Sequence, residues 1–458
     1  MTDTFLCFER DRDGGGPALD AEASRESKKV PGRHRISGGE ANCALLALPL
    51  LDPRGGDGMT GHWMGTWAAS PMNVWPGDAV LYGFHNQTVR QVVRISKGGT
   101  RFCVRLSNEH GSDPIDIGAA SIARAADGGS IEGGSLRRLT FGGSRAARIL
   151  PGAPLLSDPV ELAAGDLCDV AVSLYFSGFA PIQTYHYEAQ QTAYISDYGE
   201  FVHAERMPLQ QTSTSRYFLT AVLVECEADS RSIVCFGDSI TDGFGSTVDA
   251  NARWPDRLAE RLSAAGLLGR LGVLNHGIGG NRVTASRARG ASALARFDRD
   301  VLGLPNVGQM VLLEGINDIG WPGTMLAGPA EAVSLEDLVG SYRQLIARAH
   351  MRRIKVIQGT LTPSAGAFAG EALRTFHSPE KERVRRSVND WIRASSPADA
   401  VIDFDRALAD PKDSSRIRPE FDCGDGLHPS DAGYKAMADL FDLDLFGPPT
   451  TQAIEALP

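Results

Sequence analysis

The chain has 458 residues, of which 42% are hydrophobic and 22% charged, and these proportions exclude a wholly disordered protein. Its 46 lysines and arginines stand against 56 acidic residues, and the net charge of −10 argues against a nucleic-acid partner. No apolar run reaches the roughly 18 residues that a membrane-spanning helix requires, and the length predicts about two or three domains.

Residues 1–58 are expected to form a disordered leader. Glycine pairs and a glycine triplet interrupt a polar, charged stretch that has no sustained periodicity. One short apolar segment, Cys43–Leu51, follows basic residues at 33–35, so a degraded secretion signal is the alternative interpretation.

The 7 cysteines are scattered, odd in number and without a C-x-x-C pair. This pattern supports neither a disulfide framework nor a thiolate zinc site. We therefore favour a cytoplasmic compartment, with secretion as the alternative.

Residues 59–229 are expected to form an all-β domain, a β-sandwich or jelly-roll-like unit. Short apolar runs recur between turn signals, and no amphipathic helix pattern stands among them. The clearest runs are Thr88–Ile95, Arg101–Leu106, Ala171–Phe176 and Phe218–Val224. Gly98-Gly99 separates the first two runs and is typical of a hairpin turn.

Residues 230–448 are expected to form an α/β domain, followed by a tail at 449–458. Short apolar runs predict strands at Ile233–Phe236, Gly272–Leu274, Met310–Leu313, Ile354–Ile357 and Ala400–Ile402. Helical spacing separates them, as in Trp254, Leu258 and Leu262, with Pro255 near the helix start. Strands that alternate with helices predict a parallel sheet covered by helices on both faces.

A serine follows the first of these strands, at the sheet edge where such folds bind ligands. The segment Gly237–Gly243 reads Gly-Asp-Ser-Ile-Thr-Asp-Gly, and its first glycine permits a sharp turn. Ser239 would lie near a helix N-terminus, where developing negative charge is stabilised. A serine hydroxyl needs a base to act as a nucleophile, and a helix N-cap is the alternative role.

Candidate oxyanion donors follow the next two strands. The Gly280 N–H lies in a glycine-rich segment, Asn275–Asn281, and the Asn317 side chain follows the third strand. Each such donor contributes on the order of 3 kcal/mol to a transition state. Flexible turns are the alternative, and Arg282 breaks the spacing of a dinucleotide-binding fingerprint.

Near the C-terminus, Asp425 stands three residues before His428. A carboxylate at that spacing can fold back onto the imidazole Nδ1–H and leave Nε2 free to take a serine proton. A surface loop is the alternative for such a pair alone. Its occurrence with a serine and two donors, in this order along the chain, favours a catalytic site.

Together these segments resemble the SGNH/GDSL hydrolase superfamily. Its four blocks correspond to Gly237–Gly243, Gly280, Gly315–Asp318 and Asp425–Pro429. The resemblance implies a flavodoxin-like three-layer α/β/α sandwich, a Ser239–His428–Asp425 triad, and an oxyanion hole of Ser239, Gly280 and Asn317. Gly279 departs from the family, which often carries serine there, and Thr241 rules out the G-x-S-x-G elbow of α/β-hydrolases.

The preceding β segments, Trp67–Pro71 and Val104–Asn108, resemble the two-domain, acetylxylan-esterase-like bacterial branch of that superfamily. This second resemblance implies a serine esterase for small acyl esters, acetyl above all, on carbohydrate. The alternatives are a lipase, phospholipase, thioesterase or acyltransferase of the same superfamily, or a non-catalytic carbohydrate-binding protein.

The expected partner is a small-molecule or polysaccharide ester, with no metal or cofactor and no stated oligomeric state. Four further residues are candidates for the pocket, each with a structural alternative: Asp238, His276, Trp321 and His186. Asp403 and Asp405 end a strand and compete with Asp425 as the triad acid, although a capping role suits them better.

Overall fold

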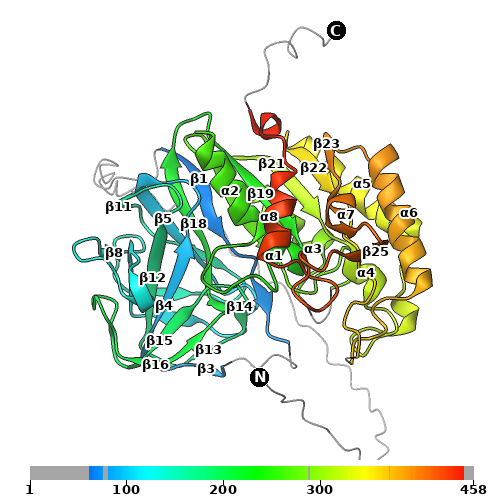
Figure 1. Ribbon diagram of the computed structural model, residues 1–458. Coiled ribbons are helices and arrows are strands. Elements are labelled where there is room, and N and C mark those ends of the chain that lie inside the picture. The colour runs from blue at the N-terminus through cyan, green and yellow to red at the C-terminus, as the bar shows by residue number, and fades with distance from the viewer. Residues whose placement is uncertain (1–60, 76–80, 287–288, 371, 448–458) are drawn as a thin grey trace, which may run out of the picture. The chain divides into compact units, whose positions relative to one another are not determined.

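A computed structural model of the chain describes residues 61–75, 81–286, 289–370 and 372–447 (Figure 1). The leader expected at 1–58 and the tail expected at 449–458 lie outside these ranges. Among the residues described, no helix is both long enough and apolar enough to cross a membrane.

Residues 62–226, here called the β region, form two main antiparallel sheets. The first sheet contains β1 (His62–Ala68), β18 (Leu219–Cys226), β5 (Gly99–Ser107), β10 (Pro154–Leu156) and β11 (Val160–Ala164). The second runs in the order β16 (Leu209–Ser213), β15 (Ala193–Tyr198), β4 (Gln87–Arg94), β12 (Asp169–Phe176), β7 (Ala119–Arg124) and β8 (Arg137–Leu139).

Alternating positions of the two sheets meet in one hydrophobic core. Val104 and Leu106 of β5 pack in it with Val172 and Leu174 of β12, because side chains two apart on a strand share a face. Shorter strands complete the region: β2 (Met72–Asn73), β3 (Gly83–Phe84), β6 (Ile115–Ile117), β9 (Ala147–Ile149), β13 (Ala180–Pro181), β14 (Thr184–His186) and β17 (Arg216–Tyr217).

The hairpin expected at Gly98-Gly99 is wrong. Strands β4 and β5 flank this turn but belong to different sheets, β4 pairing with β12 and β15, and β5 with β18, β10 and β11. The connecting residue Ser96 is bonded elsewhere, its hydroxyl donating to Thr66 O at 2.8 Å and accepting from Val273 N–H at 2.9 Å. The chain therefore crosses between sheets here instead of folding back on itself.

The second part of the chain contains one parallel sheet in the order β20-β19-β21-β22-β23. Its strands, β19 (Arg231–Gly237), β20 (Leu271–Gly277), β21 (Val307–Leu313), β22 (Lys355–Gly359) and β23 (Ala400–Ile402), coincide with the five predicted from the sequence. Numbered along the chain, the order is 2-1-3-4-5, as in flavodoxin-like folds. A small antiparallel pair, β24 (Ala409–Asp410) and β25 (Asp413–Ile417), follows it.

Helices cover both faces of this sheet (Figure 1). They are α1 (Ser239–Asp242), α2 (Trp254–Ala264), α3 (Ala293–Phe297), α4 (Ile316–Gly320), α5 (Leu335–Met351), α6 (Pro379–Ser395), α7 (Phe404–Leu408) and α8 (Asp431–Asp439). Along β19, Val234 packs in the core formed with α5 and α6, whereas Ile233 packs in the core formed with α2 and α8. Two cores on opposite faces of one sheet make three layers.

The β region shares one of these cores with the α/β part. Trp63, Cys103 and Leu223 from the first β sheet pack in the same cluster as Val234 and Phe236 of β19. The division into domains at residue 229 therefore stays a prediction, since hydrophobic packing crosses it.

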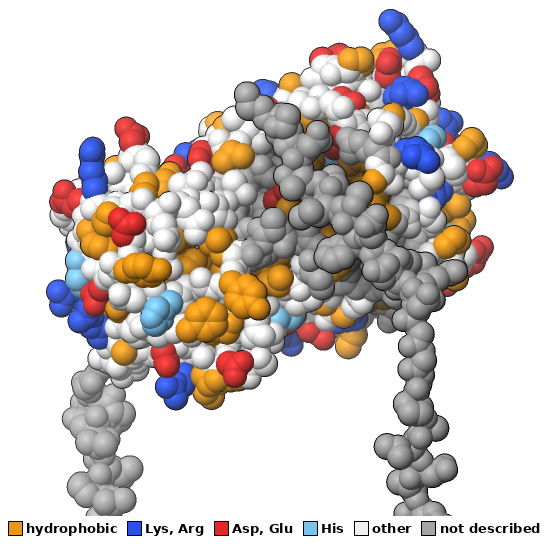
Figure 2. All heavy atoms as spheres, turned by 90° about the horizontal axis from the view of Figure 1, so that it is seen from below, with side chains coloured by type: hydrophobic (Ala, Val, Ile, Leu, Met, Phe, Trp, Pro, Cys, Tyr) orange, Lys and Arg blue, Asp and Glu red, His pale blue; other side chains and the backbone are white. Residues whose placement is uncertain are grey.

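The β region also carries exposed aromatic side chains. Tyr82 is 94% exposed, Tyr198 67% and Phe179 58%. Figure 2 shows hydrophobic side chains gathered on the part of the surface that belongs to this region. Tyr198 ends β15, whereas Tyr82 and Phe179 directly precede the short strands β3 and β13.

Candidate active site

The segment after β19 presents Ser239 at the carboxyl edge of the parallel sheet. Asp238 caps helix α1, its Oδ1 accepting the Ile240 N–H at 2.9 Å, and Ser239 is the first residue of that helix. A Cβ atom at Gly237 would lie 2.2 Å from the Leu313 carbonyl oxygen, so only glycine fits this turn. The helix ends at Gly243, whose φ of 101° favours glycine.

The loop before α8 brings an imidazole and a carboxylate to this serine. Ser239 Oγ lies 2.7 Å from His428 Nε2, and His428 Nδ1 lies 2.6 Å from Asp425 Oδ2. The Asp425 Oδ1 atom accepts the backbone N–H groups of Leu427 and His428, each at 2.8 Å. The three side chains expected from the sequence thus stand in one hydrogen-bonded row.

The Asp425 carboxylate is held in its charged form. Burial alone would raise the pKa of Asp425, but hydrogen bonds from the His428 ring and from two backbone N–H groups lower it to about 2. A charged carboxylate at Nδ1 fixes the imidazole tautomer that leaves Nε2 as the acceptor for the serine proton.

Two neighbouring loops place the expected oxyanion donors beside α1. Strands β20 and β21 flank β19, and the Ile278 N–H after β20 donates to Gly237 O at 3.0 Å. Gly280 has a φ of 75°, and a Cβ there would lie 2.6 Å from the Trp321 ring. Asn317 Nδ2 donates one proton to Asn281 O at 2.9 Å, which leaves its second amide proton for another acceptor.

Sequence reasoning missed two aromatic rings that hold the imidazole. The Phe244 ring centroid lies 4.4 Å from that of His428, and the Phe368 centroid lies 6.1 Å away. Phe244 directly follows the segment Gly237–Gly243, so its closeness to Ser239 in the sequence could have indicated a place in the site. Phe368 comes from a distant loop and no local pattern marks it.

A buried arginine beneath the serine turn was also missed. Arg296 is 1% exposed and donates to Gly237 O at 2.8 Å, to Asn281 Oδ1 at 2.9 Å and to Asp300 Oδ2 at 3.0 Å. One cation therefore ties the backbone before Ser239 to the loop that carries the glycine donor. Its place on the short helix α3 gave no sign of this role.

Two buried acids surround this arginine and the serine turn. Arg296 Nη2 lies 3.5 Å from Glu314 Oε2, and both Glu314 oxygens lack a hydrogen-bond partner. Burial raises the pKa of Glu314 well above its usual value, and the nearby Asp238 raises it further. Burial also raises the pKa of Asp238 to about 7. Both carboxyls therefore release their protons at a higher pH than exposed carboxyls do.

The residues expected in the pocket lie mainly in the interior. His276 is fully buried, with Nδ1 2.9 Å from Ser70 Oγ, and burial lowers its pKa to about 3. Asp238 faces inward as a helix cap, and Trp321 packs against Gly280. His186 is 4% exposed and bonds to Asp242, not to an open surface.

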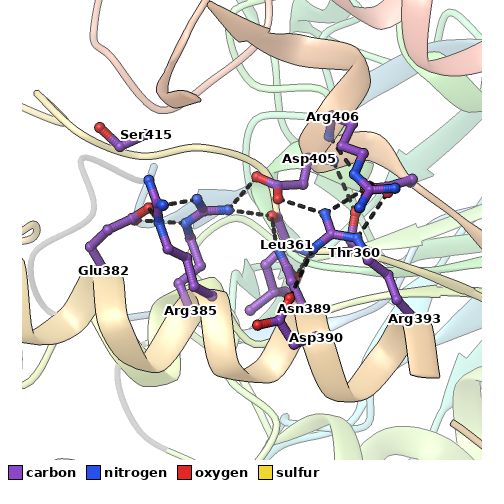
Figure 3. Close-up of polar contacts among 12 residues, drawn as sticks. Thr360, Leu361, Glu382, Arg385, Asn389, Asp390, Arg393, Asp405, Arg406 and Ser415 are labelled. Atoms are coloured by element: carbon purple, nitrogen blue, oxygen red, sulfur yellow. Dashed lines mark hydrogen bonds and ion pairs between the residues drawn. The ribbon is translucent and has the colours of Figure 1, made fainter. Parts of the chain in front are cut away.

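Asp403 and Asp405 pair with arginines of α6 and not with His428. Figure 3 shows Asp405 between Arg385 and Arg393. Asp405 accepts from Arg385 at 2.6 Å and from Arg393 at 2.7 Å. Asp403 caps α7 and accepts two hydrogen bonds from Arg393 at 2.8 Å. Both acids hold secondary structure together, the role that suited them better from the sequence.

A cavity of about 430 Å³ adjoins the carboxylate end of the triad row. Its lining combines an aromatic ring with polar side chains, among them Phe368, Asp410, Arg416, Asp422 and Asp425. A second cavity, of about 710 Å³, lies at the opposite edge of the sheet, where β19, β20 and β22 begin. Only the first of these two cavities adjoins the row.

Within the described ranges, one group of side chains has the spacing of metal ligands. The ligating atoms of Asp422, Cys423 and Asp425 lie within 4.8 Å of one another. Backbone N–H groups already occupy these carboxylates, Gly424 and Gly426 donating to Asp422 Oδ1 at 2.7 and 3.1 Å. A tight turn accounts for the group, and the expectation that the reaction needs no metal stays a prediction.

A hydroxyl, an imidazole and a carboxylate in this order, at the carboxyl edge of a parallel sheet, form the arrangement that serine hydrolases use. Residues 235–436 match the family described as the GDSL-like lipase/acylhydrolase family. The chain contains a domain of the SGNH/GDSL hydrolase superfamily and is a carboxylic-ester hydrolase, as expected from the sequence blocks.

Solved structures also show similarity to the chain. The lipase/acylhydrolase from Enterococcus faecalis is 22% identical, and the match covers 46% of this chain and 92% of that one with a TM-score of 0.35. A variant of an acetyl xylan esterase from Geobacillus stearothermophilus is 21% identical, covering 47% and 94% with a TM-score of 0.34. No curated protein matches the chain. The family assignment rests on the match over residues 235–436.

Proposed function

We propose that the protein is a serine esterase that removes small acyl groups, acetyl above all, from a carbohydrate. The observation that carries the proposal is the hydrogen-bonded row from Ser239 Oγ through His428 to Asp425, at 2.7 and 2.6 Å. This row supplies the nucleophile, the base and the group that orients the base.

In the proposed mechanism, Ser239 Oγ attacks the ester carbonyl while His428 Nε2 takes the hydroxyl proton. The N–H groups of Ser239 and Gly280 and the free amide proton of Asn317 stabilise the oxyanion. His428 then gives its proton to the departing alkoxide, which leaves an acyl-enzyme. Water, deprotonated by the same imidazole, attacks that ester and releases the acid and the serine.

Crowding around the serine supports a small acyl group. Ser239 and His428 are each 5% exposed, and Trp321 packs against Gly280 on the oxyanion side. The polar cavity next to Asp425, with Phe368 in its wall, supports an alcohol rich in hydroxyl groups. Aspartate and arginine side chains bond such hydroxyls, and an aromatic ring packs on a sugar face.

The proposal is tested by measuring hydrolysis rates on p-nitrophenyl esters from acetate to palmitate and on acetylated xylan. We expect acetate to be cleaved fastest and xylan to release acetic acid. Ser239→Ala should abolish both reactions and keep the far-ultraviolet circular dichroism of the parent protein.

Three results would contradict parts of this proposal. Activity retained in Ser239→Ala would show that Ser239 is not the nucleophile. A preference for palmitate indicates a lipase, and transfer to an added alcohol in preference to water indicates an acyltransferase.

A further inference from the structure

A histidine from the β region contacts the helix that begins with Ser239. His186 ends strand β14, and its Nε2 atom lies 3.0 Å from Oδ1 of Asp242, the last residue of α1. Its Nδ1 atom lies 3.0 Å from the Ser70 carbonyl oxygen. Both side chains of the pair are 5% exposed, so water does not compete for these bonds.

Both ring nitrogens of His186 face acceptors. The Ser70 carbonyl oxygen accepts only, so Nδ1 must carry a proton. The Asp242 carboxylate oxygen is an acceptor too, so the position of Nε2 calls for a donor as well. The β region thus presents a hydrogen-bond donor to the end of α1.

Asp242 also bonds to the glycine-rich loop that carries Gly280. Its other oxygen, Oδ2, accepts the Gly279 N–H at 3.2 Å, and Gly279 directly precedes the proposed oxyanion donor Gly280. The end of β20, just before this loop, is tied to α1 by Asn275, whose Nδ2 donates to Thr241 O at 2.7 Å. One carboxylate therefore bonds to the β region with one oxygen and to the donor loop with the other.

We infer that His186 is a positioning residue of the hydrolase: it fixes Asp242, and through Asp242 it aims the Gly280 N–H at the oxyanion. This inference rests on the proposed function of the Ser239 site. Groups that orient catalytic residues without contacting the substrate contribute about 10- to 100-fold to activity.

Two isosteric variants separate the two hydrogen bonds of His186. The Gln amide nitrogen reaches the place of Nε2, so His186→Gln keeps the donor to Asp242. The Asn amide nitrogen reaches the place of Nδ1, so His186→Asn keeps only the donor to Ser70. We expect kcat on p-nitrophenyl acetate to fall about 10- to 100-fold in His186→Asn with KM little changed, and His186→Gln to recover most of that loss.

The inhibition constant of a boronic acid inhibitor provides a second measurement, which a change in stability alone would not affect. The inhibitor forms a tetrahedral adduct with serine whose oxygen occupies the oxyanion hole, so its inhibition constant should rise by the same factor as kcat/KM falls. His203→Asn, at a partly exposed histidine of the β region, serves as the control and should change neither value.

Equal kcat per folded molecule in His186→Asn and the parent would overturn the inference, whatever the melting temperature. So would equal losses in the Asn and Gln variants, since these indicate a structural link only. If His186→Asn fails to fold, Asp242→Asn tests the same link, because its amide can accept only one of the two bonds. The inert Ser239→Ala variant tests the proposed function separately from these results.

Discussion

At the scale of single residues, the acids buried beneath Ser239 make stability depend on pH. The folded protein keeps protons on Asp238 and Glu314 at a pH where the unfolded chain, with carboxyl pKa values of about 4, has released them. A folded state that binds more protons loses stability as pH rises. The loss begins above about 4 and, for Asp238, is complete once pH passes about 7.

We therefore expect the unfolding midpoint to fall between pH 5 and 8, and Glu314→Gln to make that fall smaller. The amide cannot ionise, so the buried site no longer acquires a charge as pH rises. Thermal unfolding at several pH values measures the slope. Glu161→Gln, at a side chain that is 77% exposed, is the control and should leave the slope unchanged. An unchanged slope in Glu314→Gln would contradict the assignment.

Asn317 supplies a second test at this scale. Asn317→Ala removes a donor from the proposed oxyanion hole, and loss of one such donor lowers kcat by about 100- to 1,000-fold. KM should change little, because the charge on the oxygen develops only in the transition state. Asn317→Asp keeps the shape but replaces the donor with an acceptor, so its kcat should be at least as low. A kcat near that of the parent enzyme in either variant would remove Asn317 from the site.

At the scale of single elements, a buried arginine helps to hold helix α6 against the segments that follow β22 and β23. Arg385 is 1% exposed and bonds to Glu382, to Asp405 and to Leu361 O (Figure 3). Arg385→Met should lower the free energy of unfolding by about 1.5–3 kcal/mol, because it removes the charge-assisted hydrogen bonds to Glu382 and Asp405, which keep only Arg386 and Arg393 as cationic partners. Denaturant unfolding measures this value.

The matched control for this prediction lies on the same helix. Arg383 pairs with Glu380 at 3.0 Å, but both side chains are more than 70% exposed. Arg383→Met should leave the unfolding midpoint unchanged, since water screens an exposed pair. Equal effects of the two substitutions would mean that burial of the Arg385 ion pairs does not increase their contribution to stability.

Elements were predictable from the sequence where their signal is local. The five parallel strands and helix α2 follow from apolar periodicity within short windows. The pairing of β4 and β5 was wrong because the sheet that a strand joins depends on residues far along the chain. Gly98-Gly99 permits a turn but does not determine which strands pair.

The site divides in the same way. Ser239, Asp425 and His428 stand in short blocks whose spacing indicates their chemistry, and the structure brings them together. Arg296, Phe368 and the His186 bond to Asp242 could not be predicted, because each contact joins segments that are distant in sequence. The pocket role of His276 stays a prediction, and its complete burial could not be predicted because no local pattern marks it.

At the scale of the whole molecule, the core that joins the β region to the α/β part should make unfolding cooperative. Trp63 and Leu223 pack with Phe236 in this core, so loss of one part exposes apolar surface of the other. We expect a single calorimetric transition whose calorimetric and van't Hoff enthalpies agree. Two separated transitions would show that the parts fold independently.

The β region and the parallel sheet are joined by a connection of only four residues, Glu227–Ser230, closed by a Ser230 N–H bond to Glu227 O at 3.0 Å. Because this connection is short and hydrogen-bonded, it restricts rotation of the β region relative to the parallel sheet. The enzyme should therefore receive its substrate as a rigid receptor. Stopped-flow binding of an inhibitor should show a single phase whose rate rises linearly with inhibitor concentration, without the plateau that a slow closing step imposes.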